Sequence, residues 1–290
     1  MSFVGQTLKL VLPKGRIADK VYALLGEVGY RLEALDRSYR PKCSVPGVEV
    51  KLLKPQIIPT LLALGRHDIG FAGHDWVVEQ GAELVELMDT GFDPVRIVAA
   101  VPEAMGGSWR ELGRPLVIAT EYERLARRFV EENGLDAVVV QTHGATEVFP
   151  PEDADMIIDN TATGQTLAQN GLVEVAAILE SSTRLLARRD IRQAPPPLWE
   201  RIEDMVALVQ GVLRARHKVL LEMNVRREHL EQVVRALPAM RSPTVASLHS
   251  SDGFAIKVAV DRADVRTLVP VIRALGATDI LQFSVDMIVP

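Results

Sequence analysis

Short aliphatic runs alternate with segments of helical periodicity along the first two-thirds of this 290-residue chain. Such alternation is typical of an α/β fold with a parallel sheet, because each helix carries the chain back to start the next strand. The predicted strands cover residues 7–12, 48–53, 69–72, 96–101, 116–119, 137–141 and 154–158, with apolar runs at 173–179 and 182–187 that return the chain to the first part. One predicted helix starts at residue 17, and further helices are predicted over residues 55–64, 122–132, 166–173 and 199–215.

The composition limits the classes of function. Hydrophobic residues make up 48% and aromatic residues 5%, so the core is predicted to be mostly aliphatic. A net charge of -5 argues against a general nucleic-acid binder, and any anionic ligand must be held by local donors. Cys43 is the single cysteine, which excludes intramolecular disulfides and a cysteine-based zinc cluster. With no export signal or apolar span in the sequence, we expect a cytoplasmic protein.

The last 75 residues have a different pattern. Strands are predicted at 218–225, 244–248, 255–260 and 280–289, and helices at 228–237 and 263–275. The order is βαββαβ, which predicts a ferredoxin-like (ACT-like) domain, an arrangement common in small regulatory or dimerising modules. We therefore predict three parts: a lobe of residues 1–97 to which 185–215 return, a second lobe of 98–184, and a terminal domain of 216–290.

The segment Asp159 to Leu167 reads Asp-Asn-Thr-Ala-Thr-Gly-Gln-Thr-Leu and lies between a predicted strand and a predicted helix. A helix N-terminus has unpaired amides and a partial positive charge, both of which favour phosphate. Gly164 allows the backbone to approach a ligand closely, threonine hydroxyls can donate to phosphate oxygens, and Asp159 can accept from a ribose diol. The pattern fits a ribose phosphate. It fits equally an ordinary helix start with Thr163 as the N-cap.

Basic residues follow two of the predicted strands. Lys14 and Arg16 flank Gly15 after the first strand, and Lys54 ends another strand. Ligands of open α/β sheets bind at the edge formed by the carboxyl ends of the strands, so three cations in one cleft could hold a polyphosphate. The alternative is a pair of solvated turns.

A glycine-containing turn follows the strand at 69–72. Gly73 permits close approach of a flat ligand, and Asp75 can accept from an amine or hydroxyl. An N-cap role for Asp75 at the helix that follows is an equally good interpretation. His74 has no partner identifiable in the sequence, so we assign it no catalytic role.

Acidic residues gather before the Asp159 segment. Glu147 and Asp159 are the candidates for function, whereas Glu152 and Asp153 are better explained as a solvated turn. Carboxylates beside a diphosphate would require a divalent cation, and Mg²⁺ suits one or two carboxylates together with phosphate oxygens. The sequence contains no zinc-type His pair, nucleophile elbow, Walker loop or dinucleotide fingerprint.

These segments, in this order, resemble the ATP phosphoribosyltransferase family, the first enzymes of histidine biosynthesis, over essentially the whole chain. The similar stretches are Leu12-Pro13-Lys14-Gly15-Arg16, residues 68–75, Ile118-Ala119-Thr120-Glu121-Tyr122, residues 155–167, and, in the tail, Ser242-Pro243-Thr244. The strongest match is 155–167, which resembles the family signature ending in Thr-Gly-x-Thr-Leu. The tail resembles the regulatory domain of the long form.

The resemblance implies two catalytic lobes arranged as in periplasmic binding proteins, a cleft between them, a regulatory domain, and dimers that assemble into hexamers. It implies Mg²⁺-dependent transfer of phosphoribosyl from phosphoribosyl diphosphate to N1 of ATP, with diphosphate released and histidine as feedback inhibitor. Lys14, Arg16 and Asp159 are then expected to be catalytic. The resemblance implies that phosphoribosyl diphosphate contacts Asp159, Asn160, Thr161, Ala162, Thr163, Gly164, Gln165 and Thr166. It implies that ATP contacts Lys14, Gly15, Arg16, Lys54, Gly73, Asp75 and Glu147. Histidine is expected to bind at Asn224, Ser242, Thr244 and Ala277, and Mg²⁺, through substrate, at Glu147 and Asp159.

Two departures from the family pattern are visible. Pro151, Glu152 and Asp153 fill a turn where the family commonly has a glycine and one more residue, and Lys54 stands where arginine is frequent. A non-catalytic two-lobed solute-binding protein and a regulatory subunit without chemistry of its own are the alternatives to an enzyme. The absence of an export signal argues against the first, and the intact phosphate segment argues against the second.

Overall fold

The computed structural model describes residues 7–33, 38–238, 242–249 and 252–289. They belong to two compact units, Met1–Ile202 and Glu203–Pro290, which are taken separately below. The boundary between the units falls within one long helix, α6 (Pro196–Ala215). The predicted division of residues 1–184 into two lobes stays a prediction.

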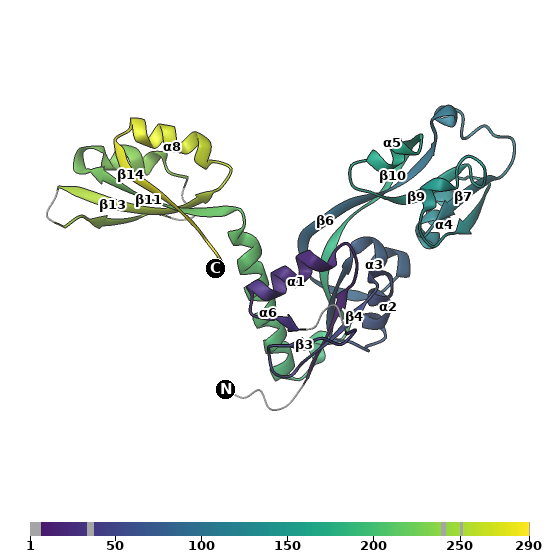
Figure 1. Cartoon of the computed structure of the whole chain (residues 1–290), viewed down its shortest axis with the longest axis horizontal. Coiled ribbons are helices and arrows are strands. Elements are labelled where there is room, and N and C mark those ends of the chain that lie inside the picture. The colour runs from purple at the N-terminus through teal and green to yellow at the C-terminus, as the bar shows by residue number, and fades with distance from the viewer. Residues whose placement is uncertain (1–6, 34–37, 239–241, 250–251, 290) are drawn as a thin grey trace. The chain divides into compact units, whose positions relative to one another are not determined.

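The first unit is built on one ten-stranded sheet (Figure 1). Its strands are β1 (Leu8–Pro13), β2 (Leu32–Glu33), β3 (Lys42–Cys43), β4 (Val48–Leu53), β5 (Ile69–Gly73), β6 (Leu84–Pro102), β7 (Leu116–Thr120), β8 (Ala137–Gln141), β9 (Met156–Thr161) and β10 (Leu172–Arg188). Its helices are α1 (Ala18–Glu27), α2 (Ile58–Ala63), α3 (His74–Gln80), α4 (Glu123–Glu132) and α5 (Gln165–Gln169), together with the start of α6.

The sheet is mixed, with strand order β2-β3-β4-β1-β5-β10-β6-β9-β7-β8. β1 is parallel to β4 and β5, and β7 is parallel to β8 and β9, as the alternation of strands and helices predicts. The sheet is not parallel throughout, because β10 runs antiparallel to β5 and β6, and β6 runs antiparallel to β9; the sequence analysis does not predict these antiparallel pairings. The two parallel groups are thus joined through an antiparallel pair.

That pair, β6 and β10, is far longer than the sequence predicts. β6 has 19 residues where a strand was expected over 96–101 only, and β10 has 17 residues with no break between its two apolar runs. Both strands continue from the group of β1, β4 and β5 to the group of β7 and β9 (Figure 1). The sequence of residues 84–95 does not predict a strand, because glycine, aspartate and several register shifts interrupt the alternation of polar and apolar residues.

Each half of the sheet has its own aliphatic core. Val11, Ile58, Leu62, Ala72 and Leu186 are buried together in the first half. In the second half one face of α4 packs on the sheet through its buried residues Leu125, Ala126 and Phe129, and a smaller cluster lies under α5. These cores fix the ends of the strands from which the candidate site is built.

Two element boundaries near the predicted phosphate segment differ from expectation. β9 runs to Thr161, so Asp159 and Asn160 are strand residues; they pair with Val98 and Ile97 of β6, and this pairing extends the strand. The helix predicted over 166–173 is only α5, Gln165–Gln169. It ends before Gly171, whose φ of +64° an L side chain rarely adopts, and β10 starts at Leu172.

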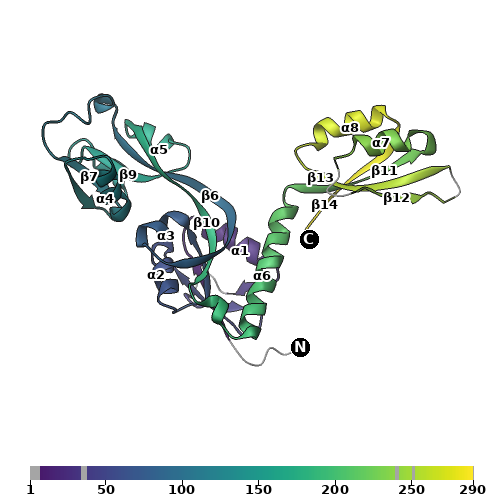
Figure 2. The same cartoon turned by 180° about the vertical axis from the view of Figure 1, so that it is seen from behind.

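The second unit has the predicted βαββαβ order. Its strands are β11 (Lys218–Arg226), β12 (Thr244–Ser247), β13 (Gly253–Asp261) and β14 (Ala277–Ser284), and its helices α7 (Leu230–Ala236) and α8 (Val265–Ala274). The sheet order β12-β13-β11-β14 is ferredoxin-like, and the helices cover one face of the sheet (Figure 2). The last strand begins at Ala277, not at residue 280, directly after Gly276 with φ +99°. The predicted connection at 250–253 lies partly outside the described residues.

A buried carboxylate ties β7 to the start of β9. Both carboxylate oxygens of Asp155 accept from the Arg114 guanidinium, at 2.7 and 2.6 Å, and Oδ2 also accepts from the Val117 backbone N–H at 2.9 Å. The Arg114 hydrogen bonds hold the pKa of Asp155 below its ordinary value, with the Val117 N–H contributing further.

We therefore expect Asp155→Asn to lower the free energy of unfolding by roughly 1–3 kcal/mol at pH 7. A depressed folded-state pKa contributes stability above the unfolded pKa of about 3.9, and this contribution is lost as pH falls through the folded value. The deficit of the variant should thus shrink below about pH 4. Urea unfolding at pH 7 and at pH 3, with exposed Asp153→Asn as control, measures this; an equal deficit at both pH values would contradict it.

Candidate functional site

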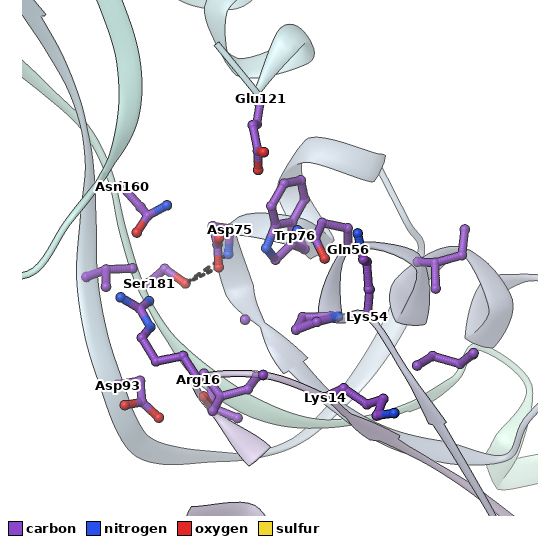
Figure 3. Close-up of a pocket in the computed structure, with 18 of the residues that line it drawn as sticks. Lys14, Arg16, Lys54, Gln56, Asp75, Trp76, Asp93, Glu121, Asn160 and Ser181 are labelled. Atoms are coloured by element: carbon purple, nitrogen blue, oxygen red, sulfur yellow. Dashed lines mark hydrogen bonds between the residues drawn. The ribbon is translucent and has the colours of Figure 1, made fainter. Parts of the chain in front are cut away.

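A cavity of about 810 Å³ opens at the carboxyl ends of the parallel strands. From the first half of the sheet, Lys14, Gly15 and Arg16 follow β1, Lys54 follows β4, and Gly73 and Asp75 follow β5. From the second half come Glu121 and Tyr122 after β7, and Asn160 of β9. The middle of β6 and β10 supplies the wall between them, with Asp93, Val95, Ser181, Ser182 and Thr183 (Figure 3).

The three predicted cations do line one cavity. Arg16 and Lys54 are exposed, and Lys14 is half-buried with its ammonium 3.8 Å from the centre of the Tyr39 ring. Gly15, with φ +89°, makes the turn between β1 and α1, and its carbonyl accepts from the Ala18 N–H. Lys14, Arg16 and Lys54 thus border the same space, as the rule for strand ends predicts, and their role in binding a polyphosphate stays a prediction.

Asp75 lies at the centre of a buried network. It is 5% exposed, and its Oδ1 accepts from Ser181 Oγ at 2.7 Å while its Oδ2 accepts from Tyr122 Oη at 2.8 Å (Figure 3 shows the Ser181 bond). Asp75 is inside α3, whose N-cap residue is Gly73, so the alternative role of Asp75 as an N-cap is wrong. Adding a Cβ to Gly73 would place it 2.2 Å from Asp75 Oδ1, which explains the glycine.

Tyr122 connects this network to β9. Its ring stacks on Trp76 with the ring centroids 4.7 Å apart, and its hydroxyl accepts from Asn160 Nδ2 at 3.3 Å. Burial, with the Asp75 carboxylate as the next cause, raises the pKa of Tyr122 far above its ordinary value. The phenol is thus held as a donor to Asp75 throughout the physiological range.

Asp159 lies beside the cavity and outside its lining, next to Asn160. Its Oδ1 accepts from the backbone N–H of Asn160 at 2.6 Å and from the Asn160 side chain at 3.1 Å. The pKa of Asp159 is raised to about 6, chiefly by burial and also by the charges of Glu121 and Glu147, while the hydrogen bond from the Asn160 N–H lowers it. Glu147, in the turn Thr146–Val148, therefore lies on the Asp159 side and apart from the cations that line the cavity.

The segment after Asp159 is an open loop. Thr161 Oγ1 accepts from the Gly164 N–H at 2.9 Å, and Gly164 has φ +78° and precedes α5. Thr163 is not the N-cap of α5, because Gly164 occupies that position. Ala162, Thr163, Gln165 and Thr166 are exposed. Ala162 borders a second cavity of about 490 Å³, which shares Val95, Ser181 and Ser182 with the first.

Two further predictions concern metal and membrane. Among the residues that the structure describes, no group of three or more His, Cys, Asp or Glu is arranged to hold a metal ion. No helix in the described ranges is long and apolar enough to cross a membrane.

The altered turn Pro150–Asp153, which contains a cis peptide bond between Pro150 and Pro151, still leads into β9. Just before that strand, the Asp155 N–H donates to the Val117 carbonyl at 2.9 Å.

The residues predicted to bind histidine all lie in the second unit, but within one copy of the chain they do not form a single site. Asn224 of β11 and Ala277 of β14 are on neighbouring strands, where Ala277 pairs with Val225. Thr244 begins β12 at the other edge of the sheet, beyond β13, and the exposed Ser242 precedes it. Asn224 Nδ2 donates to Asp279 Oδ2 at 3.0 Å and borders a surface pocket of about 620 Å³.

Several site residues were missed by the sequence analysis. Tyr122 and Glu121 belong to a stretch used only for the family resemblance, and the sequence analysis assigns no role to Trp76. Ser181 and Asp93 give no local signal, because their place in the site depends on the pairing of β6 with β10. Ser181 contacts a residue 106 positions away in the chain.

Comparison with known proteins gives consistent matches. The model of the ATP phosphoribosyltransferase family matches residues 54–211, and that of the C-terminal domain of the same family (HisG) matches residues 215–287. The ATP phosphoribosyltransferase of Pelotomaculum thermopropionicum is 37% identical over 98% of this chain and 99% of the relative, and that of Chlorobium phaeovibrioides is 36% identical over the full length of both. The chain also resembles a solved ATP phosphoribosyl transferase (HisG:HisZ) complex from Thermotoga maritima, with TM-score 0.65 and 26% identity over 72% of this chain and 99% of that chain.

The raised pKa of Asp159 has a consequence for stability. A carboxyl whose folded-state pKa lies above its unfolded value stabilises the fold least when it is ionised, so stability decreases as pH rises from about 4 to about 6. Asp159→Asn removes this titration and keeps the oxygen that accepts from the Asn160 N–H. The unfolding free energy of the variant, relative to the native chain, should increase from pH 4 to pH 6 and then stay level. Denaturant unfolding at unit steps of pH, with exposed Asp136→Asn as control, measures it; a flat or falling difference would contradict the assignment.

Proposed function

The chain belongs to the ATP phosphoribosyltransferase family, and from this membership we propose that it transfers phosphoribosyl from phosphoribosyl diphosphate to N1 of ATP, with Mg²⁺ on the leaving diphosphate and histidine as inhibitor. The family is one of glycosyltransferase-type enzymes that take the first step of histidine biosynthesis. Membership makes the chain an enzyme, so the solute-binding and regulatory-subunit alternatives lose their support. We place the activity in the cytoplasm and expect homo-oligomers.

The observation that carries the proposal is the cavity itself. Cations from two strand ends of one half of the sheet face Asn160, the residue between Asp159 and the threonine loop, in the other half. One side thus suits phosphate oxygens, with Arg16 able to bind two oxygens at once and Lys14 and Lys54 acting as point charges. The other side leads to the exposed loop Ala162–Thr166, whose hydroxyls and amides suit a ribose 5-phosphate.

Such a site accelerates the transfer chiefly by position and charge. The lone pair of adenine N1 forms the bond to C1 while the C1–O bond breaks and the diphosphate leaves with its electron pair. Lys14 and Arg16 counter the charge that grows on the leaving group, and the ionised Asp159 lies near the sugar, where positive charge develops at C1. A strong base is not needed, because N1 is unprotonated at neutral pH.

We propose that the carboxylates near Asp159 help to bind a magnesium ion that arrives with substrate. Glu121 and Glu147 both raise the pKa of Asp159, so negative charges repel one another there and a cation would relieve the repulsion. Mg²⁺ takes one or two carboxylates together with phosphate oxygens and waters, and we propose Glu147 and Asp159 for that part. When bound, the ion would neutralise charge on the diphosphate.

Removal of the Asp159 carboxylate provides the direct test of the site. With ATP, phosphoribosyl diphosphate and Mg²⁺ we expect the native chain to form product, followed by its ultraviolet absorbance. Asp159→Ala should lower turnover at least 100-fold, the order of effect expected when an electrostatic group at the reacting centre is lost. Glu152→Ala, in the nearby exposed turn, is the matched control. No product from the native chain would contradict the proposed activity, and a fully active Asp159→Ala would contradict the role of this segment.

Histidine inhibition is tested in the same assay. We propose that histidine binds through Asn224, Ser242, Thr244 and Ala277, and because Thr244 and Ala277 lie at opposite edges of one sheet, that two copies of the chain contribute. Thr244→Ala should raise the histidine concentration for half-inhibition about 10-fold while uninhibited turnover is kept, as the loss of one good hydrogen bond implies. Ser247→Ala, on the other face of β12, is the control. Product formation insensitive to histidine in the native chain would contradict the regulatory proposal alone.

A further inference from the structure

Asp93 lies where β6 and β10 change register. Val95 pairs with Ser181 and Phe92 pairs with Thr183, so Asp93 and Pro94 together oppose the single residue between those two partners. Such a bulge redirects a side chain out of the regular alternation and is frequent beside active sites. Asp93 borders the 810 Å³ cavity, and Figure 3 draws its side chain near that of Arg16.

The backbone of Asp93 is strained. Its φ is +48°, a region that side-chain-bearing residues rarely occupy, although aspartate tolerates it better than most. The proline that follows adds to the cost, because it favours extended conformations in the residue before it. Glycine would relieve the strain at this position. Backbone strain of this kind is concentrated at functional sites, so an aspartate at this position indicates that its carboxylate has a function.

The Asp93 carboxylate is only partly used by the protein. Oδ1 accepts from Lys20 Nζ at 2.8 Å, while Oδ2 is buried and has no hydrogen-bond partner among the described residues. An ionised carboxylate can accept about four hydrogen bonds, and a buried oxygen without a partner is costly. The side chain is 13% exposed and the residue lines the cavity, and because the Cβ–Cγ torsion of aspartate is soft, the carboxylate can adjust to a hydrogen-bond donor of the ligand.

The surroundings indicate what kind of group Asp93 would accept. Phosphate oxygens are repelled by a carboxylate, whereas a hydroxyl or amine of a ligand can donate a hydrogen bond to it. Arg16, Asn160 and Ser181 lie on the Asp93 side of the cavity and make it polar, whereas the Trp76 ring lies farther from Asp93 (Figure 3). A polar wall with an unsaturated acceptor suits the hydroxyls of a sugar better than a purine ring.

We propose that Asp93 is a specificity residue that accepts a hydrogen bond from a ribose hydroxyl of the ATP substrate, and so selects ribonucleotide over deoxyribonucleotide. The inference rests on the proposed function and deepens it. The ribose of phosphoribosyl diphosphate offers the same chemistry, but Asp159 already serves that sugar in the proposed arrangement, which leaves Asp93 for the nucleotide.

The test compares ATP with 2′-deoxy-ATP and 3′-deoxy-ATP, by calorimetric affinity and by kcat/KM with saturating phosphoribosyl diphosphate. We expect the native chain to prefer ATP over at least one analogue by about 10-fold to 100-fold, the value of a hydrogen bond to a charged acceptor. Asp93→Gly, which removes the carboxylate and the strain together, should reduce that preference to about 2-fold or less, with an unchanged or higher Tm. Asp93→Asn, which keeps a neutral acceptor, should be intermediate.

Lys20→Met is the matched control, because it breaks the ion pair and keeps the carboxylate. It should retain the preference for ATP. The inference is overturned if Asp93→Gly keeps the native preference, or if Lys20→Met loses it equally, since Asp93 would then act only through the ion pair. A change of KM confined to phosphoribosyl diphosphate would overturn the choice of sugar. A native chain that binds ATP but forms no product would contradict the proposed function and leave the binding comparison to decide on Asp93.

Discussion

The structure of the first unit depends on the antiparallel pairing of β6 with β10. These two strands are the only link in the described sheet between the parallel group of β1, β4 and β5 and the parallel group of β7, β8 and β9. Because the ligand edge of each group is the carboxyl end of its strands, the pair determines that both edges border one space. The irregular register of the pair between residues 172 and 188 bends the strands where the cavity lies and supplies Asp93 and Ser181 to its wall.

A network of buried hydrogen bonds then joins the two edges. Ser181 and Tyr122 each donate to one oxygen of Asp75, and Asn160 donates to both Tyr122 and Asp159. The ATP side of the proposed site is thereby connected to the sugar side through groups whose donors and acceptors are matched. A matched buried network is rigid, because breaking any one bond leaves a polar atom unpaired at a cost of about 1–3 kcal/mol. Positioning, on which the proposed transfer relies, follows from this rigidity.

The sequence predicts many of the strands and the gathering of cations at the strand ends. It does not predict the features that depend on contacts between residues distant in the chain. Short strands such as β4 and β8 were predicted at their observed bounds, because their aliphatic runs end in clear turn residues. The gathering of Lys14, Arg16 and Lys54 followed from the rule for strand ends. The length of β6, the strand character of Asp159 and the contact of Ser181 with Asp75 depend on pairing between residues distant in the chain. The pattern of residues within a short stretch of sequence does not indicate which distant strand it will pair with.

Two carboxylates at the site, Asp75 and Asp159, are held by neutral hydrogen-bond donors and not by the cations that line the cavity. Asp75 satisfies both its oxygens with neutral donors, and Asp159 is held by amides, so neither neutralises the exposed cations Arg16 and Lys54. If either carboxylate paired with a cation, a polyphosphate would first have to break that ion pair. Because Asp75 and Asp159 use neutral partners and Asp93 pairs with Lys20, the positive charge of Arg16 and Lys54 remains available to an anionic substrate. Burial, together with the charges of Glu121 and Glu147, raises the pKa of Asp159, and a bound cation or a developing positive charge at the sugar would lower it again.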